Sequence, residues 1–303
     1  MSVDSLIRGF AVYRCGQERV RLYCLDGPVI RATFNDRIEI PIVGREPLAA
    51  LWEHESVRRK EQPLDRIEEV PLLYGKYYPG VARPTGGLGS EEKVPDSHAN
   101  LEFARSVWRE LQVLTSDLER CFDVNTLSEA NLAAFGTQYE KIIYFACIGV
   151  ESCLRRVVLG TVPSERRLSM RDYVKVRDAL RLNEITIELA DYPWFPGIAP
   201  FQYWSEENPT SSLGWFDAYN RLKHDKQGNE HLASMENAIK SCAAYYAVAY
   251  ATYGSDLSPK LFSTHNYFRR AIGPKWRPED VYYPRPNHQW EPIRLLPEYV
   301  SVD

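Results

Sequence analysis

The first forty-odd residues alternate between apolar and polar positions, as strands with one buried face do. Four runs within residues 8–43 are rich in β-branched and aromatic residues: 10–13, 20–24, 29–34 and 38–42. They are separated by the turn-forming pairs Gly16-Gln17, Asp26-Gly27 and Asn35-Asp36. This pattern predicts a small antiparallel β-meander over residues 1–45. Because so small a sheet needs cover for its apolar face, we expect it to pack on the helical part of the chain.

Helical patterns begin after residue 45. Residues 46–60 predict a short helix, because Pro47 suits a first helical turn. The rest of the segment 46–96 predicts an irregular connector that contains Gly86-Gly87-Leu88-Gly89. This glycine run lacks the Gly-Lys-Ser/Thr that completes a phosphate-binding loop, so we expect a surface loop there.

Apolar residues recur at helical spacing through most of residues 97–257, which predicts a helical bundle. The longest predicted helix, 128–159, begins after Ser128 and ends at Gly160. The other predicted helices cover 97–122, 168–189 with an interruption near Asn183, 211–225 and 230–253. The pattern therefore predicts a mainly α protein, α+β overall, in which the bundle is the largest part.

Two segments are rich in proline and aromatic residues. Residues 192–209 predict an ordered loop anchored by its aromatic side chains. Residues 258–303 show no periodicity and predict an extended strap that docks on the bundle through its aromatic residues. The exposed part of the first segment, 192–204, is a possible surface for a protein partner.

Composition narrows the class of protein. The net charge of −4 argues against a broadly basic nucleic-acid coat, although it leaves room for a local phosphate site. The six cysteines show no CxxC pair, and no histidine lies at metal-ligand spacing, so we expect no metal and no cofactor. The longest apolar stretch, 142–150, is too short to span a membrane, and no signal sequence is visible. We therefore expect a cytoplasmic protein.

The densest group of reactive side chains lies in the predicted helix 211–225. Asn220, Lys223 and His224 occur at i, i+3 and i+4, so they share one face. An imidazole can act as acid or base near neutral pH, and Lys223 and Arg221 can bind phosphate. These residue types suit metal-independent RNA cleavage, in which a base activates the 2′-hydroxyl and a cation stabilises the phosphate.

The same residues also fit a purely structural role. Asp217 and Asp225 each lie four residues from Arg221 and could form ion pairs that only support the helix. Tyr219 and Asn220 could be buried hydrogen-bonding residues that tie the helix to its neighbours. In that case the chain would be a non-catalytic interaction module.

A long apolar helix, a Pro200-Phe201-x-x-Trp204 element and the motif Tyr219-Asn220-x-x-Lys223-His224 resemble the HEPN superfamily, in particular an uncharacterised bacterial group of HEPN-like proteins. The resemblance covers about residues 97–254. It implies a helical HEPN-like bundle that binds or cleaves RNA in a bacterial toxin–antitoxin or phage-defence system, as a possible homodimer. The superfamily's usual arginine, just before the polar residue, is replaced here by Tyr219.

The resemblance also suggests roles for individual residues. His224 would be the acid or base, Asn220 would orient it, and Lys223 would supply the catalytic cation. Arg221 and Tyr219 would contact substrate. Arg155 and Arg156 begin the most basic region of the chain, which continues to Arg171, and we expect an RNA backbone to lie there.

One carboxylate interrupts the apolar face of the longest predicted helix. Glu151 stands beside Val150 and near Cys153. It could pair with His224 or Lys223 across the bundle, or it could lie at a solvated edge. We favour the solvated edge, because a lone carboxylate is rarely buried.

Overall fold

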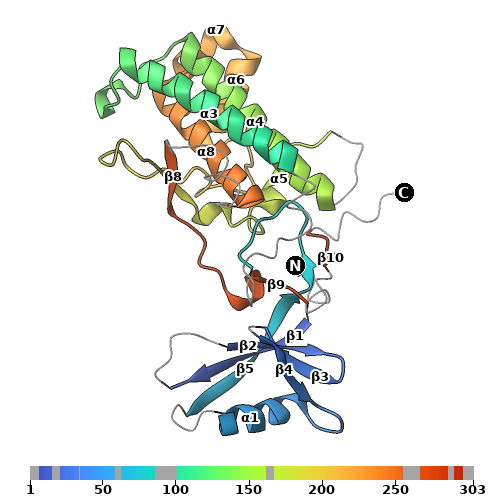
Figure 1. Cartoon of the computed structure of the whole chain (residues 1–303). Helices are drawn as coiled ribbons and strands as arrows, with labels where there is room; N and C mark the ends of the chain where they lie inside the picture. Colours follow the sequence, from blue (N-terminus) through green and yellow to red (C-terminus); the bar gives the residue numbers. More distant parts are fainter. Residues whose placement is uncertain are drawn as a thin grey trace. The chain divides into compact units, whose positions relative to one another are not determined.

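The computed structural model describes residues 7–15, 21–33, 35–58, 63–85, 101–161, 167–254, 267–285 and 290–295 (Figure 1). The chain forms two compact units. Unit 1 contains residues 1–78, 83–98 and 275–294, and unit 2 contains 79–82, 99–274 and 295–303.

Unit 1 is built on a six-stranded sheet with the order β4-β3-β2-β1-β5-β9. The first four strands are β1 (Ile7–Arg14), β2 (Arg21–Asp26), β3 (Val29–Ala32) and β4 (Asn35–Pro41). Each pairs antiparallel with the next along the chain, which confirms the predicted meander. Gly27 has a positive φ of 60° in the β2–β3 turn, a conformation that glycine adopts without strain.

Two further strands enlarge this sheet beyond the meander. β5 (Leu64–Tyr74) pairs antiparallel with β1, and β9 (Tyr282–Tyr283) adds in parallel to the end of β5. The expectation of an irregular connector over 46–96 was therefore wrong for β5. Its first half is exposed and charged while Leu72, Leu73 and Tyr74 are buried, so it lacks the regular alternation of a strand with one buried face.

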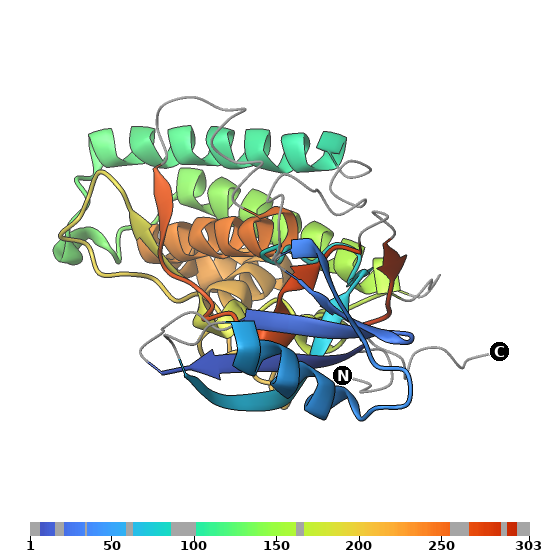
Figure 2. The same ribbon diagram turned by 60° about the horizontal axis from the view of Figure 1, so that its bottom comes forward.

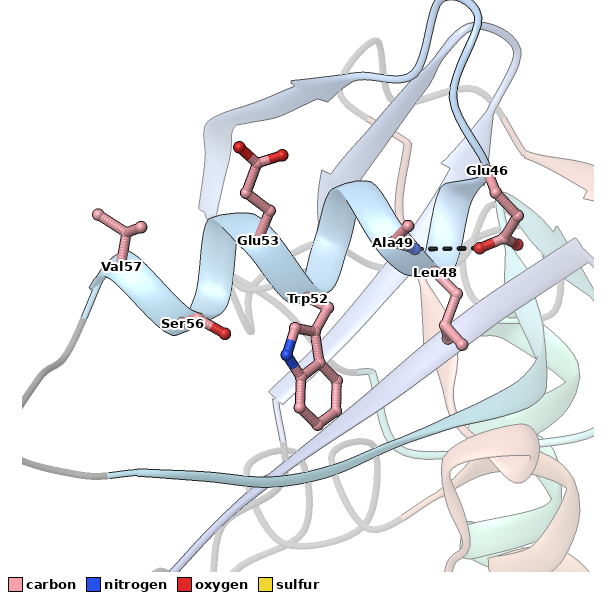
Figure 3. Close-up of a pocket in the computed structure, with 7 residues that line it drawn as sticks. All are labelled: Glu46, Leu48, Ala49, Trp52, Glu53, Ser56 and Val57. Carbon is pink, nitrogen blue, oxygen red and sulfur yellow. Dashed lines mark hydrogen bonds between the residues drawn. The ribbon is translucent and has the colours of Figure 1, made fainter.

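The short helix predicted over 46–60 is confirmed as α1 (Pro47–Arg58), and this helix covers one face of the sheet. Ala50 and Leu51 pack into a core with Phe10 and Ile30. The opposite side of α1 stays exposed: Figure 3 shows Leu48 and Trp52 projecting together from it, while Glu46 accepts a hydrogen bond from the Ala49 N–H.

Unit 2 is a helical layer whose longest elements are α3 (Leu101–Val124), α4 (Thr137–Thr161), α6 (Gly214–His224) and α8 (Met235–Tyr253). α8 packs on all three others (Figure 1, Figure 2). Its alanine-rich sequence allows close approach, and the small side chains of Ala243, Ala244, Ala247 and Ala249 are fully buried. Gly149 of α4 lies against the ring of Tyr245, where a Cβ atom would come within 2.4 Å. Gly254 ends α8 with a φ of 75°.

Short elements connect these helices. They are η2 (Glu129–Asn131), α5 (Met170–Tyr173), η3 (Val174–Val176), η4 (Leu182–Glu184), α7 (Lys226–Asn229) and η5 (Glu230–Leu232). Helix α4 begins at Thr137 rather than after Ser128, because Ala134 and Leu132 pair with the start of α8 instead. The predicted helix 168–189 was wrong over most of its length. Only Met170–Tyr173 is α-helical, short 3-10 helices and turns follow, and the β-branched Thr186 and Ile187 form a strand, β7 (Thr186–Leu189).

The C-terminal segment contributes strands to both units. β8 (Phe268–Ile272) pairs antiparallel with β7 in unit 2. In unit 1, η6 (Pro278–Asp280) precedes β9, and β10 (Glu291–Pro292) pairs in parallel with β6 (Lys76–Tyr77).

The expectation of a mainly α protein was wrong. The described residues are 47% helical and 22% strand, and the protein is α+β. The sequence pattern located the meander but missed β5, β7 and the strands of the C-terminal segment, which become strands only through long-range pairing.

Candidate functional site

Helix α6 is amphipathic and carries the sequence motif. Trp215, Phe216 and Tyr219 lie on its buried side. Its last turn holds Arg221, Lys223 and His224, and the positive charges of Arg221 and Lys223 suit the negative end of a helix dipole. The C-terminal end of the helix is therefore cationic, and its buried side is aromatic.

Tyr219 ties this helix to α4. Its ring is 4% exposed, lies edge-on to Tyr144 at 5.7 Å, and has the Lys223 ammonium 5.5 Å from its centroid. Its hydroxyl donates a hydrogen bond to the Glu151 carboxylate. Burial and the negative charge of Glu151 raise the pKa of Tyr219 to about 12, so the phenol stays a donor at neutral pH.

Glu151 is half-buried between these side chains. Burial raises the pKa of Glu151, and the positive charge of Lys223, the Tyr219 hydrogen bond and Arg167 offset only part of that effect. The carboxyl group therefore holds its proton more tightly than a free glutamate does. The favoured expectation of a solvated edge was wrong for this residue.

Further cations surround the carboxylate. Arg155, which follows Glu151 by one helical turn, donates a hydrogen bond to the Tyr173 hydroxyl, and burial raises the pKa of Tyr173. Arg167 is exposed and close enough for its charge to act on Glu151. We call Glu151, Tyr173, Tyr219, Lys223, Arg155 and Arg167 the Glu151 cluster.

The other predicted site residues have different surroundings. His224 is exposed at the end of α6 and Asn220 is half-buried, but no hydrogen bond joins the two in the described part of the chain. Arg221 is exposed, and among the described residues it pairs with neither Asp217 nor Asp225. Arg156 stacks on the Phe103 ring of α3 at 4.6 Å, away from the cluster.

The structure thus brings Tyr219, Lys223 and Arg155 together around Glu151, and it adds Tyr173, which sequence reasoning missed. The only sequence signal for Glu151 was its place within an apolar helix face. About three helical turns before Glu151 on α4, Glu140 forms a salt bridge of 2.8 Å with Lys226, so this carboxylate has a direct partner that Glu151 lacks among the described residues.

The described residues give no support for a metal site or for a membrane-spanning helix. No three His, Cys, Asp or Glu side chains gather there as metal ligands would. No helix among the described residues has the length and apolar character needed to cross a membrane.

Comparison of the chain with protein-family models, with curated proteins and with solved structures found no match. The resemblance to HEPN-like proteins therefore stays a prediction from the motif.

Proposed function

We propose that unit 2 binds the phosphate backbone of RNA at the Glu151 cluster and cleaves it without a metal ion, with His224 as acid or base. The main support for this proposal is that side chains of α6 differ in burial. Tyr219 is buried and hydrogen-bonded, whereas Lys223 and His224 of the same helix are exposed. An ammonium and an imidazole that are exposed to solvent are also accessible to a phosphate and a ribose hydroxyl.

The charges of the cluster support an anionic ligand. Lys223 and Arg167 act on the Glu151 carboxylate, whose pKa is raised by burial, and Arg155 acts on the neighbouring Tyr173. A bound phosphate would meet the positive charges of Lys223 and Arg167, both of which act on Glu151. Glu151 and Tyr219 act as positioning residues, since they hold the Lys223 ammonium over the Tyr219 ring.

The chemistry needs no group beyond these residues and the RNA. His224 accepts the proton of a ribose 2′-hydroxyl, whose oxygen then forms a bond to the adjacent phosphorus. The bond from phosphorus to the 5′-oxygen breaks, and that oxygen takes up a proton from the imidazolium or from water. Lys223 stabilises the extra negative charge on the phosphate in the transition state. This activity would fit a bacterial toxin or phage-defence protein, as the HEPN-like motif suggests.

The test is cleavage of a labelled RNA pool by the purified full chain in EDTA. We expect His224→Ala to lower the rate by about a hundredfold or more, because it removes the acid or base. Lys223→Ala should lower it by a similar or smaller factor. His231→Ala and Lys141→Ala are matched controls, since both residues are exposed in unit 2 and lie outside the cluster.

Circular dichroism should show that all four variants are folded. If the wild-type chain cleaves no RNA, or if His224→Ala cleaves at the wild-type rate, the proposal is wrong. The motif would then be a structural network, and the chain would be an interaction module.

A further inference from the structure

A second surface of unit 2 has the opposite charge. The turn Tyr192–Phe195 follows β7 and contains Pro193 at its second position. It is closed by a 2.9 Å hydrogen bond from the Phe195 N–H to the Tyr192 carbonyl. Because proline fixes the backbone of such a turn, it holds Trp194 in one place, and that side chain is 71% exposed.

The exposed indole is part of an aromatic corner. Trp194 meets the ring of Tyr192 at 5.5 Å and 74°. Tyr192 in turn packs edge-on against Phe122 of α3 at 5.7 Å and against Tyr267 at 6.1 Å. Two faces of rigid rings set nearly at right angles are a suitable shape for a cationic group, which is attracted to ring faces.

The end of α3 places carboxylates beside this corner. Asp123 follows Phe122, and Glu119 lies one turn earlier on the same side of the helix. Asp191 precedes Tyr192 in the turn. In agreement with this placement, burial and the negative charges of Glu119, Asp191 and Asp123 raise the pKa of Tyr192.

No described cation pairs with these carboxylates. Within the described ranges none of the three forms an ion pair, and the last turn of α3 contains no basic residue. Glu119 and Asp123 also lie at the negative end of the helix dipole, where a carboxylate is unfavourable. Among the described residues, the surface therefore holds negative charge without a paired cation, next to the exposed ring of Trp194.

We propose that this surface, formed by Trp194, Tyr192, Glu119, Asp123 and Asp191, docks a basic segment of a partner protein, with an Arg or Lys side chain stacked on Trp194. A guanidinium fits best, because its plane stacks on the indole while its N–H groups reach the carboxylates. RNA is a poor occupant, since three carboxylates would repel its phosphates. The proposal is independent of RNA cleavage at the Glu151 cluster.

The test is fluorescence polarisation with three labelled hexapeptides, of arginine, lysine and glutamate, added to the full chain at low and high salt. We expect the arginine peptide to bind most tightly, the glutamate peptide not to bind, and added salt to weaken binding. Trp194→Ala should weaken arginine-peptide binding about tenfold. The double variant Asp123→Asn/Asp191→Asn, which leaves the turn intact, should weaken it by a similar factor.

Two control variants separate this surface from general effects. Tyr203→Ala removes another aromatic ring of the same segment, which is 76% exposed, and Glu207→Gln removes an exposed charge elsewhere in unit 2. Both should leave the affinity unchanged. Equal binding by Trp194→Ala and wild type would overturn the proposal. Two other results would also overturn it. If Trp194→Ala mainly abolished self-association of the chain, the occupant would be a second copy. If the variant mainly lost binding to a uridine oligonucleotide, the occupant would be RNA.

Discussion

Glu55 in unit 1 and Glu151 in unit 2 are both carboxylates on the inner side of a helix, but their surroundings differ. Glu55 is fully buried, forms a 2.6 Å salt bridge with Arg14 and accepts a hydrogen bond from Tyr23. Glu151 is only half-buried, and it has a hydrogen bond from Tyr219 but no salt bridge in the described part of the chain.

The pKa values of the two groups shift in opposite directions. For Glu55, burial raises the pKa, but the hydrogen bonds from Tyr23 and Arg14 and the charges of Arg14 and Arg21 outweigh it, so the net shift is downward. For Glu151 burial outweighs its partners, and the pKa is raised. For a carboxylate that stabilises a fold, ion pairs and hydrogen bonds offset the full cost of burying its charge. A carboxylate whose partners offset only part of that cost is a candidate for function.

The largest expected effect comes from breaking the Glu55 network. Glu55→Ala removes the carboxylate that forms the buried salt bridge with Arg14, whose side chain is 1% exposed. We expect the free energy of unfolding of unit 1 to fall by about 3–5 kcal/mol. Urea unfolding followed by hydrogen exchange in β2 and α1 measures this. Glu53→Ala is the matched control, because Glu53 lies on the same helix in an exposed pair with Arg45, and it should cost less than about 1 kcal/mol.

The same pair predicts how stability depends on pH. Because the folded-state pKa of Glu55 is lowered, its contribution is present above the ordinary carboxyl pKa and is lost as the pH falls through the folded value. Unit 1 should therefore unfold more easily in acid, and Glu55→Gln should remove part of that dependence. An acid unfolding profile that is identical in wild type and Glu55→Gln would contradict this assignment.

Removal of the Tyr219 hydroxyl should have a moderate effect. Tyr219→Phe deletes the hydrogen bond to Glu151 but keeps the buried ring. We expect unit 2 to lose about 1 kcal/mol of stability and the pKa of Glu151 to rise further. Thermal melts and a carbon NMR titration of the glutamate carboxyls measure both. Tyr203→Phe, at an exposed position, should change neither.

The smallest effect on stability is expected at Glu151 itself, and its sign is opposite to that at Glu55. Because the folded-state pKa is raised, the ionised carboxylate costs stability at neutral pH, and this cost disappears as the pH falls below the ordinary carboxyl value. Glu151→Gln keeps an acceptor for Tyr219 and should leave unit 2 equally stable, or more stable by less than about 1 kcal/mol, at pH 7. A clear loss of stability in melts at pH 7 would place Glu151 with Glu55 as a structural residue.

The local sequence pattern predicted the elements that are determined by interactions between residues close together in the sequence. The β1–β4 meander, α1 at Pro47 and the end of α8 at Gly254 follow from alternation, turn residues and helix-terminal chemistry. β5 and β7 did not follow, because the charged half of β5 and the short Thr186–Leu189 run become strands only when distant segments pair with them.

The candidate site was also predicted only in part from the sequence. Helical spacing placed Asn220, Lys223 and His224 on one face of a helix, and the sequence grouped Arg155 and Arg156 in one basic region. In the structure Arg155 joins Tyr173 and Arg156 stacks on Phe103. No spacing rule within one helix shows that Glu151 faces Tyr219, since that contact depends on how α4 packs against α6.

The most direct test of the contrast between the two carboxylates is the rate of RNA cleavage by Glu151→Gln in EDTA, measured on the same preparation as its melting temperature. We expect Glu151→Gln to cleave RNA at least about tenfold more slowly than wild type, with a melting temperature that is not lowered. Wild-type cleavage by the folded variant, or a loss of cleavage explained by unfolding, would contradict a functional role for the Glu151 cluster.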